Sequence, residues 1–264
     1  MVIIPEYRIE YKYGDSFRIK PLFDTHIGNA YCDIDSIKRY LSDTDDKTYI
    51  IGGGDTLDSV IVTDKRYAKH VDGSTSDAII DEQIDVAYDI LKPYKDRIVG
   101  LGSGNHEETI VTRNGTNPTR RLSRMLGVPH LGIDWHIRMV FSENGSSGRT
   151  LVIFGHHGWG GGSRTIGADL TKFSRKATDT DADIYLFGHV HRRQSVMLTR
   201  TGFRGGKHVA KELHLFICGT FLKTFSLTDE STYSERAGFP PTPIGGVNIT
   251  ITPTAKWVKI ESDV

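Results

Sequence analysis

The sequence predicts a layered α/β fold, and three features of its patterning carry that prediction. Short apolar runs alternate with segments of helical periodicity over the first 190 residues. These runs are rich in Val, Ile and Phe and end at Gly or Asp, as strands buried on both faces do. Beyond residue 190 the runs are strand-like and are separated by turn residues. Such an order is typical of a layered fold whose later strands add to, or form, a second sheet.

Nine strands are expected from the apolar runs. Five of them alternate with helices and cover residues 17–23, 48–51, 97–101, 151–154 and 184–187. The later four cover residues 194–199, 213–217, 247–251 and 257–260.

The clearest helix is predicted over residues 77–91. Its apolar side chains recur at positions 80, 84, 87 and 91, which is the spacing of one helix face. Ser76 is a suitable N-cap, and Pro93 ends the helix because it pushes Lys92 out of the helical region. Further helices are predicted over residues 35–41, 118–126 and 168–177.

A single domain over residues 1–264 is expected. The chain has no internal repeat, no low-complexity block and no Pro/Gly/Ser-rich linker between two apolar halves. The motifs described below span residues 24–191, and the strands within 193–264 are expected to complete the second sheet.

Composition excludes several classes of protein. The 33 Lys and Arg balance the 33 Asp and Glu, so no overall field attracts nucleic acid or an anionic membrane. The 38% apolar and 25% charged content is that of a globular protein. The two cysteines, Cys32 and Cys218, are too few for a disulfide framework, and no apolar run of about 18 residues occurs. We expect no signal peptide, because residues 1–6 have no basic segment and too short an apolar run. We therefore expect a cytoplasmic protein that makes no membrane contact.

Polar residues of one kind follow the five early strands. Because ligands bind at the carboxyl ends of strands in open α/β sheets, these residues are expected to meet in one place. They are Asp24, His26, Asp55, Asn105, the pair His156 and His157, His189 and His191.

The residue types favour a metal site with two ions. Imidazole suits Zn, Fe and Ni, whereas carboxylate and amide oxygens suit Mn and Mg. Seven ligands exceed what one tetrahedral ion needs, and two ions that share a carboxylate would use them. A single structural zinc is disfavoured by the ligand count and the lack of thiolates.

In this order the motifs resemble those of the calcineurin-like metallophosphoesterase family. That family's pattern is Asp-x-His, Gly-Asp, Gly-Asn-His-Asp/Glu, a histidine at a strand end, and Gly-His-x-His, and the segments from residue 24 to residue 191 match it. The resemblance implies a four-layer α/β/β/α sandwich, in which helices flank two mixed sheets and two metal ions lie at the strand ends.

The resemblance also implies a role for each matched residue. The first ion would be held by Asp24, His26 and His191, the second by Asn105, His189 and one histidine of the 156–157 pair, and Asp55 would bridge them. The family has one histidine where this chain has a pair. His156 is preferred because it is the first polar residue after the predicted strand, and His157 is the alternative ligand. His106 would face the leaving group as the catalytic acid.

These roles imply a phosphoesterase. Two ions roughly 3.5–4 Å apart lower the pKa of a bridging water and clamp the phosphoryl oxygens. We expect Mn, with Fe, Zn or Ni as alternatives, and we favour phosphodiester substrates such as a nucleotide or nucleic acid. The alternatives are a phosphomonoesterase that acts on a protein or small molecule, and a metal-bound scaffold without turnover. The oligomeric state is left open.

Weaker signals are read in two ways. Trp159 and Arg164, in the glycine-rich loop after the histidine pair, are expected either to contact substrate or to pack on the body. The basic residues at 192–211 and the arginines at 120, 121 and 124 are read as solvated faces rather than nucleic-acid contacts. Asp58 is read as a helix cap in preference to a residue that orients a ligand histidine.

Overall fold

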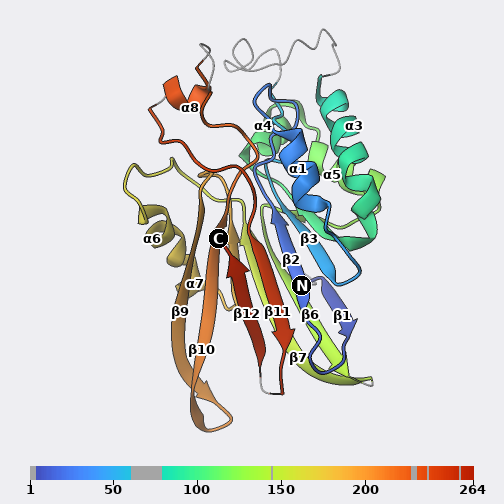
Figure 1. The fold of residues 1–264 in the computed structure, drawn as a ribbon, viewed down its shortest axis with the longest axis vertical. Coiled ribbons are helices and arrows are strands. Elements are labelled where there is room, and N and C mark those ends of the chain that lie inside the picture. The colour runs from blue at the N-terminus through green and yellow to red at the C-terminus, as the bar shows by residue number, and fades with distance from the viewer. Residues whose placement is uncertain (1–3, 61–78, 144, 227–230, 237, 256) are drawn as a thin grey trace.

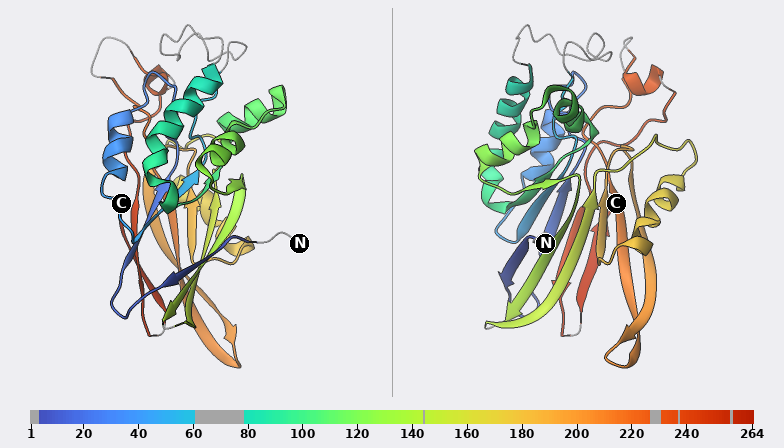
Figure 2. Two further views of the ribbon diagram at one scale, coloured as in Figure 1. Left: turned by 90° about the vertical axis from the view of Figure 1, so that its right-hand side faces the viewer. Right: turned by 180° about the vertical axis from the view of Figure 1, so that it is seen from behind.

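The computed structural model describes residues 4–60, 79–143, 145–226, 231–236, 238–255 and 257–264. Two six-stranded mixed sheets face one another, and helices cover the outer face of each (Figures 1 and 2). The predicted four-layer α/β/β/α arrangement is therefore confirmed.

The first sheet has the strand order β12-β11-β2-β3-β4-β5. Strands β2 to β5 run parallel, β11 pairs antiparallel with β2, and β12 pairs antiparallel with β11 at the edge. The bounds are β2 Phe17–Leu22, β3 Thr48–Gly53, β4 Ile98–Gly102, β5 His130–Gly132, β11 Asn248–Pro253 and β12 Val258–Asp263.

The second sheet has the order β1-β6-β7-β8-β10-β9. Its bounds are β1 Glu6–Glu10, β6 Asp134–Glu143, β7 Ser146–His156, β8 Ile184–Phe187, β9 Arg193–Arg204 and β10 Lys207–Cys218. The C-terminal strands are thus divided, since β9 and β10 extend this sheet while β11 and β12 extend the first. The expectation that all of them complete the second sheet differs from the structure, because the chain crosses between sheets after β10.

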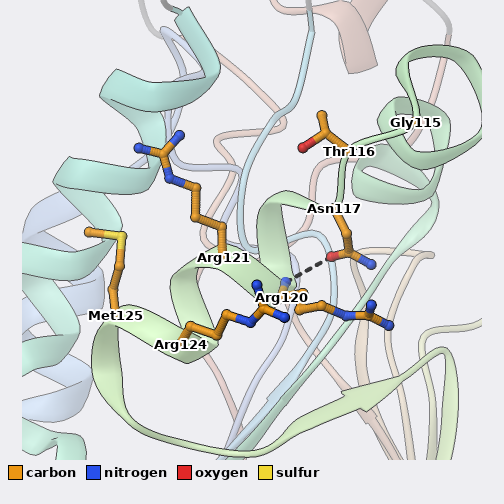
Figure 3. Close-up of a pocket in the computed structure, with 7 residues that line it drawn as sticks. All are labelled: Gly115, Thr116, Asn117, Arg120, Arg121, Arg124 and Met125. Atoms are coloured by element: carbon orange, nitrogen blue, oxygen red, sulfur yellow. Dashed lines mark hydrogen bonds between the residues drawn. The ribbon is translucent and has the colours of Figure 1, made fainter.

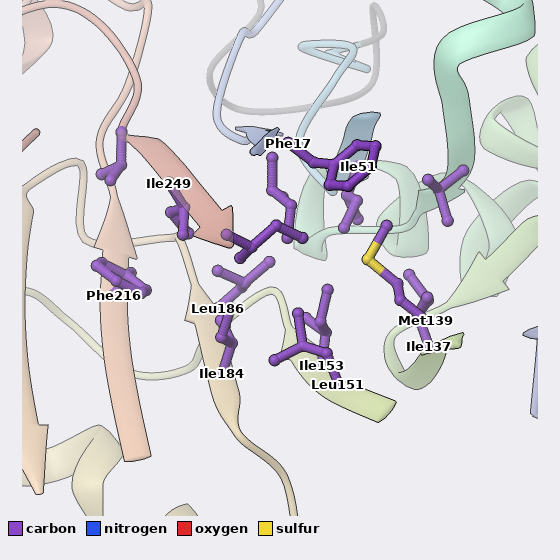
Figure 4. Packing of buried hydrophobic residues seen from close by; sticks show 14 of the residues in the cluster. Phe17, Ile51, Ile137, Met139, Leu151, Ile153, Ile184, Leu186, Phe216 and Ile249 are labelled. Atoms are coloured by element: carbon purple, nitrogen blue, oxygen red, sulfur yellow. The ribbon is translucent and has the colours of Figure 1, made fainter. Parts of the chain in front are cut away.

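The core between the sheets is built from the inward side chains of both. Phe17 and Ile51 of the first sheet pack in one cluster with Ile137, Ile153 and Leu186 of the second (Figure 4). Burial of alternate side chains on facing strands is what holds two sheets together.

Helices cover the first sheet's outer face through a second apolar cluster. Ile37, Ile84 and Leu122 of three helices pack on Ile50 and Leu101. The helices are α1 Ile34–Leu41, α3 Ile79–Leu91, α4 Asn105–Asn114 and α5 Pro118–Leu126, with a 3₁₀ turn at Lys92–Arg97.

A third cluster lies under the outer helices of the second sheet. Phe173 of α6 (Ala168–Ser174) and Ala177 of α7 (Lys176–Asp179) pack on Tyr185 and Leu215. A short helix, α8 (Tyr233–Arg236), lies in the connection before β11. Among the described helices, none has the length and apolar content needed to cross a membrane.

All nine predicted strands and the four helices are present, with bounds that shift by a few residues or more. The proposed cap Ser76 lies outside the described residues. The predicted helix at 168–177 is divided in two at Arg175. Strands β1, β5 and β6 and helices α4 and α8 were not predicted, and α4 matters because Asn105 is its first residue.

Candidate metal centre

The predicted ligands meet at one edge of the sandwich. Asp24 and His26 follow β2, Asp55 follows β3, and Asn105 begins the helix after β4. From the other sheet, His156 is the last residue of β7 and His157 follows it, while His189 and His191 follow β8. Parallel strands β2, β3 and β4 deliver their carboxyl ends to the same edge, and so do β7 and β8.

One group of possible ligands comes from the loops after β2 and β8. It comprises Asp24, His26 and His191, whose ligand atoms all lie within 4.8 Å of one another. His26 Nε2 is 3.1 Å from His191 Nε2, and His191 Nε2 is 3.5 Å from Asp24 Oδ1. This is the trio that the resemblance implied for the first ion.

A second group comprises Asp55, His157 and His189. His157 Nε2 lies 3.0 Å from Asp55 Oδ2. Asn105 Oδ1 lies 3.1 Å from His157 Nε2 and 2.7 Å from His189 Nδ1, so the amide joins this group.

Asp55 lies between the two groups. Its Oδ2 is 3.0 Å from His157 Nε2 of one group and 4.0 Å from His26 Nε2 of the other. Asp24 Oδ1 also faces both, at 3.5 Å from His191 and 3.8 Å from His157. That oxygen is buried and accepts no hydrogen bond from the described residues, which is rare in folded proteins and fits a site for a cation.

The histidine pair is placed opposite to our preference. His157 is buried among the other ligands, whereas His156 Nδ1 accepts a hydrogen bond from the Gly158 N–H at 2.8 Å. Strand β7 continues two residues past the predicted end, to His156. Because neighbouring side chains in a strand point to opposite faces, His156 turns outward and His157 inward.

The candidate ligands of this cluster occur along the chain in the motif order described above. In fold and site the chain resembles the calcineurin-like metallophosphoesterases. No protein-family model matches the chain, and no curated protein does.

Three solved structures are similar to this chain over most of their length. A conserved uncharacterized protein from Streptococcus pneumoniae, described as a predicted phosphoesterase, is 13% identical with a TM-score of 0.35, over 94% of this chain and 99% of that one. Vps29 from Entamoeba histolytica, solved with zinc, is 15% identical with a TM-score of 0.24, over 68% and 88%. A Thermotoga maritima protein is 12% identical with a TM-score of 0.28, over 94% and 99%.

The candidate site is held in strained backbone. Six non-glycine residues of the described chain have positive φ, and five of them are predicted ligands. They are Asp24 (φ 49°), His26 (48°), Asp55 (48°), His189 (73°) and His191 (56°). Such conformations cost on the order of 1–3 kcal/mol each and concentrate at functional sites, because the surrounding fold must enforce them.

Electrostatics keep the carboxylates of the site charged. Burial alone would raise the pKa of Asp55, but His157 and His106 outweigh it and hold this pKa well below its ordinary value. Burial would lower the pKa of His157, yet Asp55 and Asp24 raise it to about 10. Burial lowers the pKa of His26 and of His189.

Two ligand histidines are oriented through their Nδ1 atoms. His157 Nδ1 lies 3.2 Å from the Gly53 carbonyl oxygen, and His26 Nδ1 lies 3.3 Å from Asp58 Oδ1. Donation from Nδ1–H leaves the Nε2 lone pair aimed at the site. Asp58 thus orients His26. Its interpretation as a helix cap falls on the segment after residue 60, and residues 61–78 lie outside the described residues.

Glu107 is a residue whose role the sequence did not indicate. It is fully buried and accepts hydrogen bonds from the backbone N–H groups of Asp55 (3.0 Å), Leu57 (3.0 Å) and Gly104 (2.9 Å). Burial and the neighbouring Asp55 raise its pKa to about 7. Its position after the Gly-Asn-His motif is the one available signal, and its effect is to fix the loop that carries Asp55.

His106 borders both the ligands and a cavity. Its Nδ1 lies 2.5 Å from the Asp58 carbonyl oxygen, and its Nε2 lies 3.9 Å from Asp55 Oδ2. It also belongs to a third group of possible ligands with His26 and Asp55. The cavity, of about 200 Å³, is lined in part by His26, His106, Tyr31, Leu222 and Lys223.

The weaker signals lie outside this arrangement. Trp159 packs on the body, with ring centroids 5.0 Å from Phe173 and 5.1 Å from His156, while Arg164 is exposed. Strand β9 leaves the site at Arg193 and runs 12 residues, about 40 Å, to the opposite end of the molecule (Figure 1). Most of the basic β9–β10 hairpin is therefore remote from the ligands.

Proposed function

We propose that this chain is a binuclear metal-dependent phosphoesterase. The observation that carries the proposal is the buried Asp24 Oδ1, which accepts no hydrogen bond from the described residues and lies 3.5–3.8 Å from the Nε2 atoms of three histidines. A cation in that space would satisfy an oxygen that otherwise costs about 1–3 kcal/mol. Because Asp55 faces both groups of ligands, two ions rather than one fit the donor set.

The donor atoms also favour the kind of ion. They are imidazole nitrogens, carboxylate oxygens and one amide oxygen, with no thiolate among them. Such mixed nitrogen and oxygen sites suit Mn or Fe, and also Zn or Ni. We propose Mn, with the other three as alternatives.

Different residues of the chain have different roles in the proposed hydrolysis. Divalent ions bound here would supply a hydroxide nucleophile and positive charge at the phosphoryl group. Asp58 and the Gly53 carbonyl keep His26 and His157 in the tautomer that presents Nε2 to the site. His106 donates Nδ1–H to the Asp58 carbonyl, and its Nε2 is then placed to give a proton to the leaving oxygen.

We propose a phosphodiester as the substrate. The cavity beside His106 borders the candidate ligands His26 and His191, and its wall also includes apolar Leu222 and Val60 together with Tyr31 and Lys223. It gives room for a second ester group beside the leaving group, and a phosphomonoester has no such second group. A phosphomonoesterase and a non-catalytic metal-bound scaffold are the alternatives.

A parallel assay tests the proposal. Purified protein loaded with Mn is offered an aryl phosphodiester, an aryl phosphomonoester, single-stranded DNA and duplex DNA, with and without a chelator. We expect metal-dependent turnover, fastest on a diester. Turnover of the monoester alone would select the phosphomonoesterase, and no turnover of any substrate would select the scaffold.

The histidine pair gives a matched comparison. His157→Ala removes a buried ligand atom beside Asp55 and Asn105, and should lower metal content and turnover by about 10²-fold or more. His156→Ala removes a half-buried ring that contacts Trp159, and should leave metal content near wild type. Elemental analysis of both variants checks this. Loss of metal in His156→Ala alone would return the ligand assignment to His156.

Metal binding should release a proton. The pKa of His157 is about 10 in the metal-free protein, so its imidazole is protonated at pH 7 and must lose that proton to ligate. Binding should therefore tighten as pH rises towards 10, by about tenfold for each pH unit if one proton is released. Calorimetric titrations with Mn in buffers of different ionisation enthalpy measure the release. Heats that do not depend on the buffer would contradict it.

A further inference from the structure

The end of α4 remote from the metal centre leads into a second hollow. It has a volume of about 450 Å³ and is lined by the turn and helix after α4 (Figure 3). Its lining residues are Gly115, Thr116, Asn117, Arg120, Arg121, Arg124 and Met125.

Two arginines of this hollow, Arg120 and Arg124, form no ion pair with a carboxylate of the described residues. Arg120 and Arg124 are four residues apart on α5, so their side chains lie on the same face of the helix. Both are exposed, and no carboxylate of the described chain forms an ion pair with either. Arg121 points elsewhere and pairs with Asp81. Like charges at this spacing destabilise a helix, and a bound anion would reverse that effect.

The surroundings of the pair add hydrogen-bond donors, and no carboxylate is among the described residues that line the hollow. Thr116 offers a hydroxyl at the rim of the hollow, while the Asn117 side chain is engaged by the Arg120 backbone N–H at 2.7 Å. Burial lowers the pKa of His130, and the charge of Arg120 lowers it further. Three guanidinium groups line the hollow, those of Arg120, Arg121 and Arg124. Paired guanidinium groups match phosphate geometry.

The distance from the metal centre suggests what kind of anion binds. Helix α4 begins at the proposed ligand Asn105 and has ten residues, so its ends are separated by about 15 Å. Phosphates repeat about every 3.4 Å along one strand of a stacked nucleic acid. A strand that runs along α4 could thus have one phosphate at the metal centre and another, about four nucleotides away, at the turn that opens the arginine hollow.

We propose that Arg120 and Arg124 bind a backbone phosphate of a nucleic acid strand whose scissile phosphodiester lies at the metal centre. This rests on the proposed function, since it names the substrate class of the same site. The contact would position the strand without reading its sequence. Free phosphate or a phosphoprotein would occupy the metal centre or the arginine hollow alone. A nucleic acid strand would occupy both at once.

The test compares two double variants with equal loss of charge. R120Q/R124Q removes the pair from α5. K38Q/R39Q removes two exposed charges from α1 and is the control. With Mn-loaded protein, kcat/KM is measured on single-stranded DNA of two, eight and twelve nucleotides and on an aryl phosphodiester. R120Q/R124Q should lower kcat/KM about tenfold on the longer strands and leave the dinucleotide and aryl ester unchanged, since only longer strands reach the hollow.

A binding measurement separates this proposal from the proposed function. In the presence of a chelator, fluorescence anisotropy follows a labelled twelve-nucleotide strand at several salt concentrations. R120Q/R124Q should weaken binding and reduce the salt slope by about 0.7 for each phosphate that the variant no longer binds, and K38Q/R39Q should not. Three outcomes would overturn the assignment of the arginine pair to a nucleic acid strand. The first is an equal effect of both variants, and the second is a loss of kcat/KM on the dinucleotide as large as on the longer strands. The third is weakened binding of R120Q/R124Q to anionic lipid vesicles in place of DNA. If no substrate is turned over, the proposed function is overturned, but the anisotropy measurement still tests whether the arginine pair binds the strand.

Discussion

Replacing Asp55 with asparagine is expected to lower kcat on an aryl phosphodiester by about 10³-fold, because it weakens both metal sites at once. Asp55 Oδ2 faces His157 at 3.0 Å and His26 at 4.0 Å, so this carboxylate oxygen is placed between the two groups of ligands. The amide is nearly the same size and keeps one acceptor oxygen, but it lacks the charge that offsets two dications. Elemental analysis should show that Asp55→Asn binds less than one ion per chain.

A matched change elsewhere separates this effect from the loss of any carboxylate. Asp96 is exposed in the 3₁₀ turn at Lys92–Arg97, and Asp96→Asn should retain wild-type turnover and metal content. Circular dichroism should show that both variants are folded. An Asp55→Asn variant that kept two ions and full activity would remove the shared carboxylate from the mechanism.

Most of the layers could be predicted from the sequence because strands buried on both faces consist of continuous runs of apolar residues. Phe17 and Ile51 begin or end such runs, and both lie in the core between the sheets. Strand β6 was missed because Asp134, His136 and Arg138 interrupt its apolar residues. Those residues alternate with buried Trp135, Ile137 and Met139, so the strand has one face in the core and one outside it.

The clustering of the candidate ligands was predictable from the motifs, and the choice of histidine within the 156–157 pair was not. Motif order brought the residues of five strand ends together, but the choice between His156 and His157 depended on where β7 ends. A shift of two residues in a strand end is within the ordinary uncertainty of reading a sequence. Neighbouring side chains in a strand point to opposite faces, so an error of one residue in the register exchanges the inward and the outward histidine. The orienting role of Asp58 depends on a contact with His26 across 32 residues, which no local pattern encodes.

Replacing His106 with alanine should separate two kinds of leaving group. General acid catalysis contributes typically 10²–10⁴-fold, roughly 3–5 kcal/mol of barrier. A nitrophenolate departs without a proton, whereas the alkoxide of a sugar hydroxyl does not. His106→Ala should therefore cost little on an aryl diester and about 10²-fold or more on an alkyl diester. The kcat values on a nitrophenyl and a nucleoside diester, measured side by side, give this ratio.

The geometry around His106 also defines what the result would mean. Its Nδ1 contacts the Asp58 carbonyl at 2.5 Å, and its Nε2 lies 3.9 Å from Asp55 Oδ2, near enough to the ligands that it could itself bind an ion. Metal content in His106→Ala distinguishes these roles, and it should stay near wild type if the residue acts on the leaving oxygen. Equal rate losses on both esters with full metal content would assign His106 to binding the phosphoryl group or orienting the nucleophile. Loss of metal would make it a ligand, and the proton would then have to come from another group on the wall of the cavity, where Tyr31 and Lys223 are the candidates.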